Sequence, residues 1–115
     1  MKAERITAEA VAPYVARAAG EHLRGIMRQV LSGECQAYRL DDGQAYAVVR
    51  PQEEELVVVL FEGREWLGYV PKLWNMAAML GFSSVRGHFQ RRGIEKWARE
   101  LGCEFVETVY RKRLR

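Results

Sequence analysis

Two histidines and two cysteines are among the residues of this chain whose types suit acid–base, nucleophilic or metal chemistry. His22 falls in a predicted helix, and His88 ends a short predicted strand. No supporting motif accompanies them, so a Ser-His-Asp arrangement is not indicated. Cys35 and Cys103 do not share the spacing of metal ligands. Two lone cysteines in a chain without a secretion signal fit buried thiols in a reducing cytoplasm, where we expect the protein to reside.

The size and composition predict one domain spanning residues 1–115. The chain has a mass of 13.3 kDa, and 49% of its residues are hydrophobic, which suffices for a globular core. No apolar run approaches 18 residues, so no transmembrane helix is predicted. The N-terminus lacks the apolar region of a secretion signal, and no membrane partner is expected.

The positive charge is concentrated at the C-terminal end. Residues 1–85 carry nine Lys and Arg against eleven Asp and Glu, whereas residues 86–115 carry nine against four. The excess could attract the phosphates of a nucleotide cofactor or of a nucleic acid, or it could be a solvated basic face. Tyr14 and the tryptophans are expected to be core and corner residues rather than a base-stacking surface, so nucleic-acid binding is the weaker hypothesis.

The first third of the chain predicts one strand and two helices. Residues 3–6 form the strand, and Thr7 is the predicted N-cap of the first helix because its hydroxyl can accept from a free backbone N–H. Gly20 separates this helix from a second one, which ends at Ser32-Gly33. A period of 3.6 among the apolar residues of the second helix predicts one buried face. This face consists of Leu23, Ile26, Met27, Val30 and Leu31.

Three strands are predicted next, at residues 35–40, 45–50 and 56–61. Asp41-Asp42-Gly43 indicates a tight turn, because Asp-Gly tolerates positive φ at both positions. Pro51 and residues 52–55 form the following turn. The run 56–61 is apolar without alternation, which favours a central strand buried on both faces. The short connections predict an antiparallel meander.

A helix, a glycine and a strand then follow one another twice. After a predicted loop over residues 62–70, a helix begins near Pro71 and ends at Gly81, and residues 83–89 form a strand. A second helix ends at Gly102 before a strand over 103–110. Both glycines are predicted to adopt the left-handed conformation of a helix C-cap. The apolar face of the first helix is predicted from Leu73, Trp74, Ala77, Ala78 and Leu80.

This order of elements, with the closing segment WARELGCEFVETVYRKRL, resembles the GNAT superfamily of N-acetyltransferases. In that family a helix runs into a Leu-Gly-Phe corner before a final strand, and here Leu101-Gly102 precede Cys103. The resemblance implies an α+β fold with a mixed, mostly antiparallel central sheet flanked by helices, in the order β-α-α-β-β-β-α-β-α-β.

The resemblance also implies a site for acetyl-CoA. The thioester arm of the cofactor would bond to the free edge of the strand from Val57 to Phe61, and the pyrophosphate would lie on the loop and helix N-terminus that follow. The family's Gln/Arg-x-x-Gly-x-Gly/Ala signature is absent from this loop, and a near match at residues 90–95 is read as a coincidence. The candidate cofactor-binding residues are Val58, Leu60, Phe61, Gly63, Arg64 and Gly68.

Acyl transfer to an amine needs a base for the ammonium proton and an acid for the leaving thiolate. Glu62 and His88 are the candidate bases, since each ends a strand beside the implied notch. The family's tyrosine acid falls at Ala98 in this chain, so Tyr110 or Tyr69 would have to replace it.

Two functions follow from the resemblance. The chain is either an N-acyltransferase that moves an acetyl group from acetyl-CoA to a small-molecule or protein amine, or an inactive binding or assembly module with the same fold, of the kind found in phages or mobile elements. Exposed edges of a small mixed sheet would make a homodimer plausible in both cases.

Overall fold

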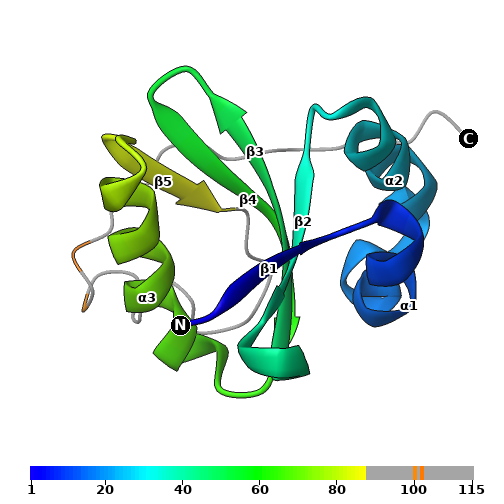
Figure 1. Ribbon diagram of the computed structural model, residues 1–115, viewed down its shortest axis with the longest axis horizontal. Coiled ribbons are helices and arrows are strands. Elements are labelled where there is room, and N and C mark those ends of the chain that lie inside the picture. Colours follow the sequence, from blue (N-terminus) through cyan, green and yellow to red (C-terminus); the bar gives the residue numbers. More distant parts are fainter. Residues whose placement is uncertain (88–99, 101, 103–115) are drawn as a thin grey trace, which may run out of the picture.

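A single mixed sheet with helices on both faces forms the part of the protein that the computed structural model describes, residues 1–87, 100 and 102 (Figure 1). Helices α1 and α2 cover one face of the sheet, and α3 covers the other. The strands lie in chain order, with antiparallel pairing from β1 to β4 and parallel pairing of β4 with β5. They are β1 (Ala3–Ile6), β2 (Gln36–Leu40), β3 (Ala45–Gln52), β4 (Glu55–Gly63) and β5 (Ser84–Gly87).

The predicted α+β class and the mostly antiparallel sheet are confirmed. The helical elements are α1 (Ala8–Ala19), the short 3₁₀ turns η1 (Gly20–His22) and η2 (Asp41–Gly43), α2 (Leu23–Ser32) and α3 (Trp66–Met79). The last predicted helix and strand, with the C-terminal basic residues, lie outside the described residues. No helix in the described part is long and apolar enough to cross a membrane.

Helices α1 and α2 pack as the sequence predicts. The Thr7 hydroxyl accepts from the Ala10 N–H at 3.1 Å and caps α1, and Gly33 ends α2 with φ 86°. Val11 and Val15 are fully buried against the sheet, and most of the apolar face predicted for α2 packs around them. The exception is Leu31, which is 78% exposed although its neighbour Val30 packs against the core.

The meander is confirmed, with two differences in its connections. Leu40 pairs with Ala45, so the first connection is residues 41–44, as the predicted strand bounds imply, but its turn also holds Asp41 at a positive φ of 46°. The second connection is shorter than predicted, because β3 continues through Pro51. This proline lies beyond the end of the β2–β3 pairing, where its missing N–H breaks no bond to β2. Cys35 is fully buried, as predicted.

Helix α3 begins earlier than predicted. The loop expected over residues 62–70 is wrong, because β4 extends to Gly63 and α3 starts at Trp66. Gly68 and Pro71 therefore lie inside the helix. The buried face is shifted toward the N-terminus as a result: Leu73 and Ala77 are buried as predicted, whereas Ala78 and Leu80 are exposed and Tyr69 is buried instead.

Gly81 ends the α3 segment with φ 93°, and Gly102 has φ 76°. Both values lie in the left-handed region, so the conformation predicted for the two glycines is confirmed.

Candidate functional site

Within the part of the chain that the structure describes, strand β4 is paired on both edges at its start and on one edge at its end. Parallel pairing with β5 runs from Glu55–Ser84 to Val58–Gly87, and beyond Val58 no described residue pairs with β4 on this side. The register with β3 shifts between Val48 and Val49, which leaves an extra residue, Val59, in β4 at this point. A bulge of this kind bends a strand and increases its local twist.

The residues proposed to bind the thioester arm fall into two groups, those that pair with β5 and those that have no described β5 partner. Val58 is paired with Gly87, so among the described residues the unpaired edge expected from Val57 onwards begins only after Val58. Leu60 and Phe61 lie in the stretch without a described β5 partner. Their side chains point to opposite faces, Leu60 to the α1–α2 core and Phe61 toward α3. Backbone groups on the β5 side of this stretch are therefore the ones that could bond an extended ligand.

The start of α3 stands next to this edge. Its N-cap, Glu65, has left-handed backbone angles, and its side chain makes no capping hydrogen bond. The Gly68 N–H donates to the Glu65 carbonyl at 2.8 Å. The first turn of a helix carries backbone N–H groups without helical acceptors, and its dipole favours an anion there.

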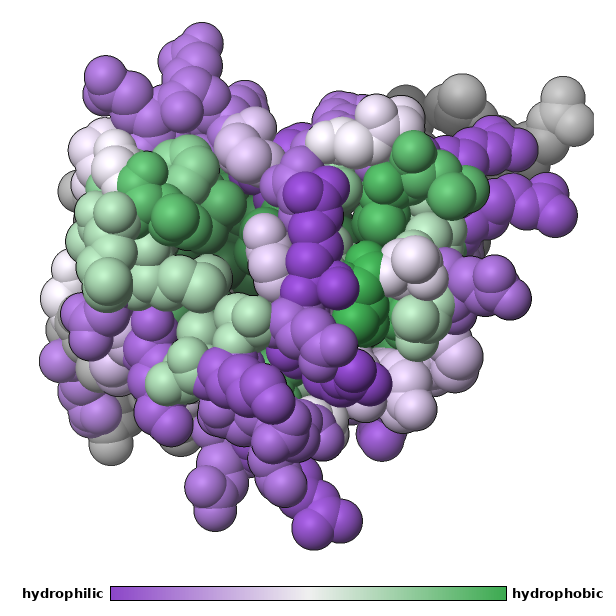
Figure 2. Space-filling view, in the orientation of Figure 1, coloured by the Kyte–Doolittle hydropathy of each residue, from purple (hydrophilic) through white to green (hydrophobic). Residues whose placement is uncertain are grey.

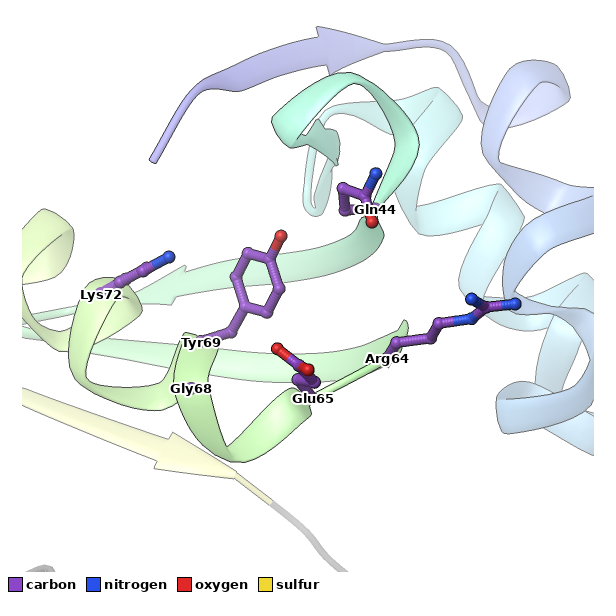
Figure 3. Close-up of a pocket in the computed structure, with 6 residues that line it drawn as sticks. All are labelled: Gln44, Arg64, Glu65, Gly68, Tyr69 and Lys72. Carbon is purple, nitrogen blue, oxygen red and sulfur yellow. The ribbon is translucent and has the colours of Figure 1, made fainter.

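A shallow hollow of about 410 Å³ opens beside this turn. Figure 3 shows Lys72 on α3 and Arg64 at the end of β4, with Arg64 extending away from Tyr69 and Lys72. These two cations and the carboxylate of Glu65 give the hollow a mixed charge with a positive excess. Its lining residues are Gln44, Arg64, Glu65, Gly68, Tyr69 and Lys72.

The two glycines proposed as cofactor-binding residues have different surroundings. A Cβ on Gly63 would lie 2.6 Å from the Ala45 Cβ, because β3 and β4 approach closely at this pair. The close approach of β3 and β4 therefore accounts for a glycine at position 63, and no ligand is needed to explain it. A Cβ on Gly68 would meet nothing within 4 Å, so only Gly68 leaves open space where a ligand could approach the backbone.

The Tyr69 hydroxyl already takes part in a hydrogen bond within the fold. Its hydroxyl donates to the Asp41 carboxylate at 2.8 Å, and Lys72 Nζ lies 5.1 Å from the centre of its ring. Burial raises the pKa of Tyr69, and the Asp41 carboxylate raises it further. The Lys2 backbone N–H and the Tyr69 hydroxyl lower the pKa of Asp41. A phenol held in this way is a poor donor of a proton to a thiolate.

Glu62, the first candidate base, lies on the opposite face of the sheet, directly across from Tyr46 of β3. Its side chain is half-buried and makes no hydrogen bond or ion pair with a described residue. Such a carboxylate can accept a proton or bind a cation. His88 and Tyr110 lie outside the described residues, so their roles stay predictions.

Sequence reasoning missed Asp41, Lys72 and Tyr46. Asp41 was assigned only to a turn, and its contact with Tyr69 spans 28 positions, which no local pattern reveals. Lys72 could have been found by recognising that α3 starts before Pro71. Tyr46 could have been identified from the sequence, because it stands two residues before Val48 and therefore lies on the same sheet face, the one that meets α1.

Comparison with known proteins places this arrangement in a fold class. No protein-family model matches the chain, and no curated protein matches its sequence. Solved structures do match. A ribosomal-protein-alanine N-acetyltransferase from Brucella melitensis biovar Abortus 2308 is similar with a TM-score of 0.62 at 12% identity, covering 99% of this chain and 100% of the other.

Two further structures agree. A probable acetyltransferase is similar with a TM-score of 0.60 at 12% identity, covering 100% of this chain and 97% of the other. The aminoglycoside N-acetyltransferase AAC(6')-Iy in complex with CoA is similar with a TM-score of 0.58 at 12% identity, covering 97% of this chain and 94% of the other. Likeness at these identities shows the fold alone. The chain has the GNAT acetyltransferase fold, as its order of elements predicts.

Proposed function

We propose that this protein is an acyl-CoA-dependent N-acyltransferase that moves an acetyl group from acetyl-CoA to an amine. One observation carries the proposal: the end of β4 without a described β5 partner lies next to the uncapped first turn of α3. An extended thioester arm could bond to the first, and a pyrophosphate to the second. The likeness to an aminoglycoside acetyltransferase solved with CoA supports this assignment.

Each part of the proposed site has a task. The edge of β4 at Leu60 and Phe61 would hold the arm, and Gly68 would let the phosphates approach the backbone of α3. Arg64 and Lys72 would neutralise their charge. These roles rest on the position of the residues around the hollow and along the stretch of β4 that has no β5 partner among the described residues.

Glu62 is the base in this proposal. Its carboxylate would take one proton from the acceptor ammonium, and the neutral amine would then attack the thioester carbonyl. The carbon–sulfur bond breaks, and the thiolate leaves with a proton from the new amide nitrogen, directly or through water. The half-buried position of Glu62 and its lack of a described partner support this role.

A non-catalytic binding module is the second candidate. Ala45 leaves no space at Gly63 for a ligand to approach, and the Tyr69 hydroxyl is hydrogen-bonded to Asp41, so neither is free for a ligand or a proton transfer.

We propose further that the protein works in the cytoplasm, and that a homodimer would use an edge other than β1. Figure 2 shows a hydrophilic band over the β1 edge, where the Glu4–Arg39 ion pair discourages edge pairing.

The test is release of free thiol from acetyl-CoA in the presence of primary amines. We expect turnover by the wild type and a loss of about 10²-fold or more in kcat for Glu62→Gln. Tight CoA binding without thiol release from any amine would reject the enzyme and leave the binding module.

A further inference from the structure

The C-terminal end of α3 exposes two large apolar side chains next to each other. Met79 is 88% exposed and Leu80 is 66% exposed, and the preceding Ala78 is exposed as well. Figure 2 shows hydrophobic residues gathered over this end of α3, at the upper left. Single exposed apolar residues need no explanation, whereas a group of them indicates a surface that contacts something.

The other exposed large apolar residues of the two N-terminal helices form no such group. Leu31 is 78% exposed, but it follows the exposed Arg28 by one turn of α2. Tyr14 is 52% exposed, so the expectation that it is a core residue is wrong, and its ring is stacked on that of Tyr46 with centroids 4.1 Å apart. The apolar group on α3 is therefore a distinct feature of this helix.

This face of α3 also carries no charge. The sequence contains no charged residue between Lys72 and Arg86. The exposed positions Asn75, Ala78 and Met79 have the i, i+3, i+4 spacing of one helical stripe. The exposed faces of α1 and α2, by contrast, carry glutamate and arginine side chains. Depletion of charge together with exposed methionine is typical of the centre of a protein–protein interface.

Charges of opposite sign lie at the two ends of this face. Lys72, which also lines the hollow, is exposed at the N-terminal end. The turn between β3 and β4 adjoins the C-terminal end, because the Ser83 N–H donates to the Glu54 carbonyl at 2.8 Å. Glu53 and Glu54 of this turn are exposed, and Glu53 makes no hydrogen bond or ion pair with a described residue. The face therefore has a cationic end, an uncharged centre and an acidic end.

Such a face is complementary to itself about a two-fold axis. When two α3 helices pack antiparallel, the cationic end of each lies next to the acidic turn of the other, and the two uncharged stripes meet between them. The dipoles of the two helices are also opposed in this arrangement. Parallel packing would instead bring like charges together.

We propose that the protein forms a homodimer in which α3 of one copy packs antiparallel on α3 of the second copy. The contact is centred on Asn75, Ala78 and Met79. A second copy is the partner because the same face supplies both the apolar surface and the opposite charges that the first copy needs. Helix α3 packs over β4 and β5, on the side of the sheet away from β1 (Figure 1). The contact is independent of the proposed acyl transfer.

Sedimentation velocity of the full chain over a range of concentrations tests this contact. We expect a concentration-dependent dimer. Met79→Glu should weaken self-association about tenfold or more, since it would bury a carboxylate in the contact. Leu31→Glu, an equally polar change at an exposed position on α2, is the matched control and should have no effect. Both side chains are exposed in one copy, so neither change should unfold the protein.

Reversing the charges tests the antiparallel arrangement. Lys72→Glu and Glu53→Lys should each weaken dimerisation several-fold at low salt, because each places like charges together twice in the dimer. An equimolar mixture of the two variants should restore it, since the mixed dimer has one native pair and one reversed pair. A monomer at every concentration, a dimer that Met79→Glu leaves unchanged or Leu31→Glu weakens equally, or a mixture no stronger than its components would overturn the inference.

Discussion

The hydroxyl of Tyr69 donates a hydrogen bond to the carboxylate of Asp41 at 2.8 Å, which joins the first turns of α3 to the connection between β2 and β3. The same carboxylate accepts from the Lys2 backbone N–H at 2.8 Å, so three distant segments meet at Asp41. This contact holds the start of α3 against the sheet beside the hollow. The position of the proposed phosphate site depends on it.

Removing the Tyr69 hydroxyl should destabilise the fold modestly. We expect Tyr69→Phe to lower the free energy of unfolding by about 1 kcal/mol, the usual value of such a bond, and to lower Tm by roughly 4 °C. Tyr38→Phe is the matched control, since Tyr38 packs in the same apolar cluster and its hydroxyl bonds no described residue. Chemical denaturation of both variants measures the difference, and equal losses would contradict the assigned role.

The Asp41 contacts predict a pH dependence of stability. Because the folded state lowers the pKa of Asp41 below its ordinary 3.8, the ionised carboxylate favours folding. This contribution is complete above pH 3.8 and is lost as the pH falls through the lower pKa of the folded state. Denaturation between pH 6 and pH 2 should therefore show a smaller acid-induced loss for Asp41→Asn than for the wild type. Parallel curves would contradict the prediction.

The two glycines of the proposed site should respond in opposite ways to alanine. Gly63→Ala forces a methyl group to 2.6 Å from the Ala45 Cβ and should cost about 1–3 kcal/mol of stability. Gly68→Ala meets no atom and, within a helix, should stabilise by up to about 1 kcal/mol. If CoA phosphates approach this backbone, the more stable Gly68→Ala protein should nevertheless bind CoA more weakly. Unchanged CoA affinity would place the phosphates elsewhere.

The cations of the hollow should contribute to CoA affinity separately. Replacing Arg64 or Lys72 by Gln should weaken CoA binding by about three- to tenfold, since each removes one charge-assisted contact to a phosphate. Arg28→Gln, an exposed change on α2, is the control. Calorimetry at two salt concentrations measures this effect, and the loss should shrink at high salt. If all variants bound CoA with equal affinity, the hollow would not be part of the CoA site.

The strands and the two N-terminal helices were predictable because their signals are local. Thr7 caps its helix through a contact three residues away, and the apolar run from Leu56 to Phe61 identifies the central strand. The start of α3 was not predictable by the same reasoning. Pro71 indicates a first turn, whereas the tertiary contacts of Tyr69 extend the helix backwards past it.

The candidate site was predictable in part for the same reason. Glu62 and Arg64 could be named as candidates from their place at the end of the predicted central strand, and Arg64 lines the hollow beside the start of α3. The described pairing of β4 with β5 ends at Val58, and this end point depends on the register of β5. The position of Glu62 directly across from Tyr46 depends on the register between β3 and β4. Neither can be read from the order of residues along one strand.

The central claim is that the end of β4 and the start of α3 hold a CoA thioester, and a thermal shift with CoA and acetyl-CoA in moderate salt tests it most directly. Ligand at about 100 times its dissociation constant should stabilise the folded protein by about 2.7 kcal/mol, several degrees in Tm for a domain of this size. We expect this shift in the wild type and a smaller one in Lys72→Gln. A cooperative transition that does not move at millimolar CoA would contradict it.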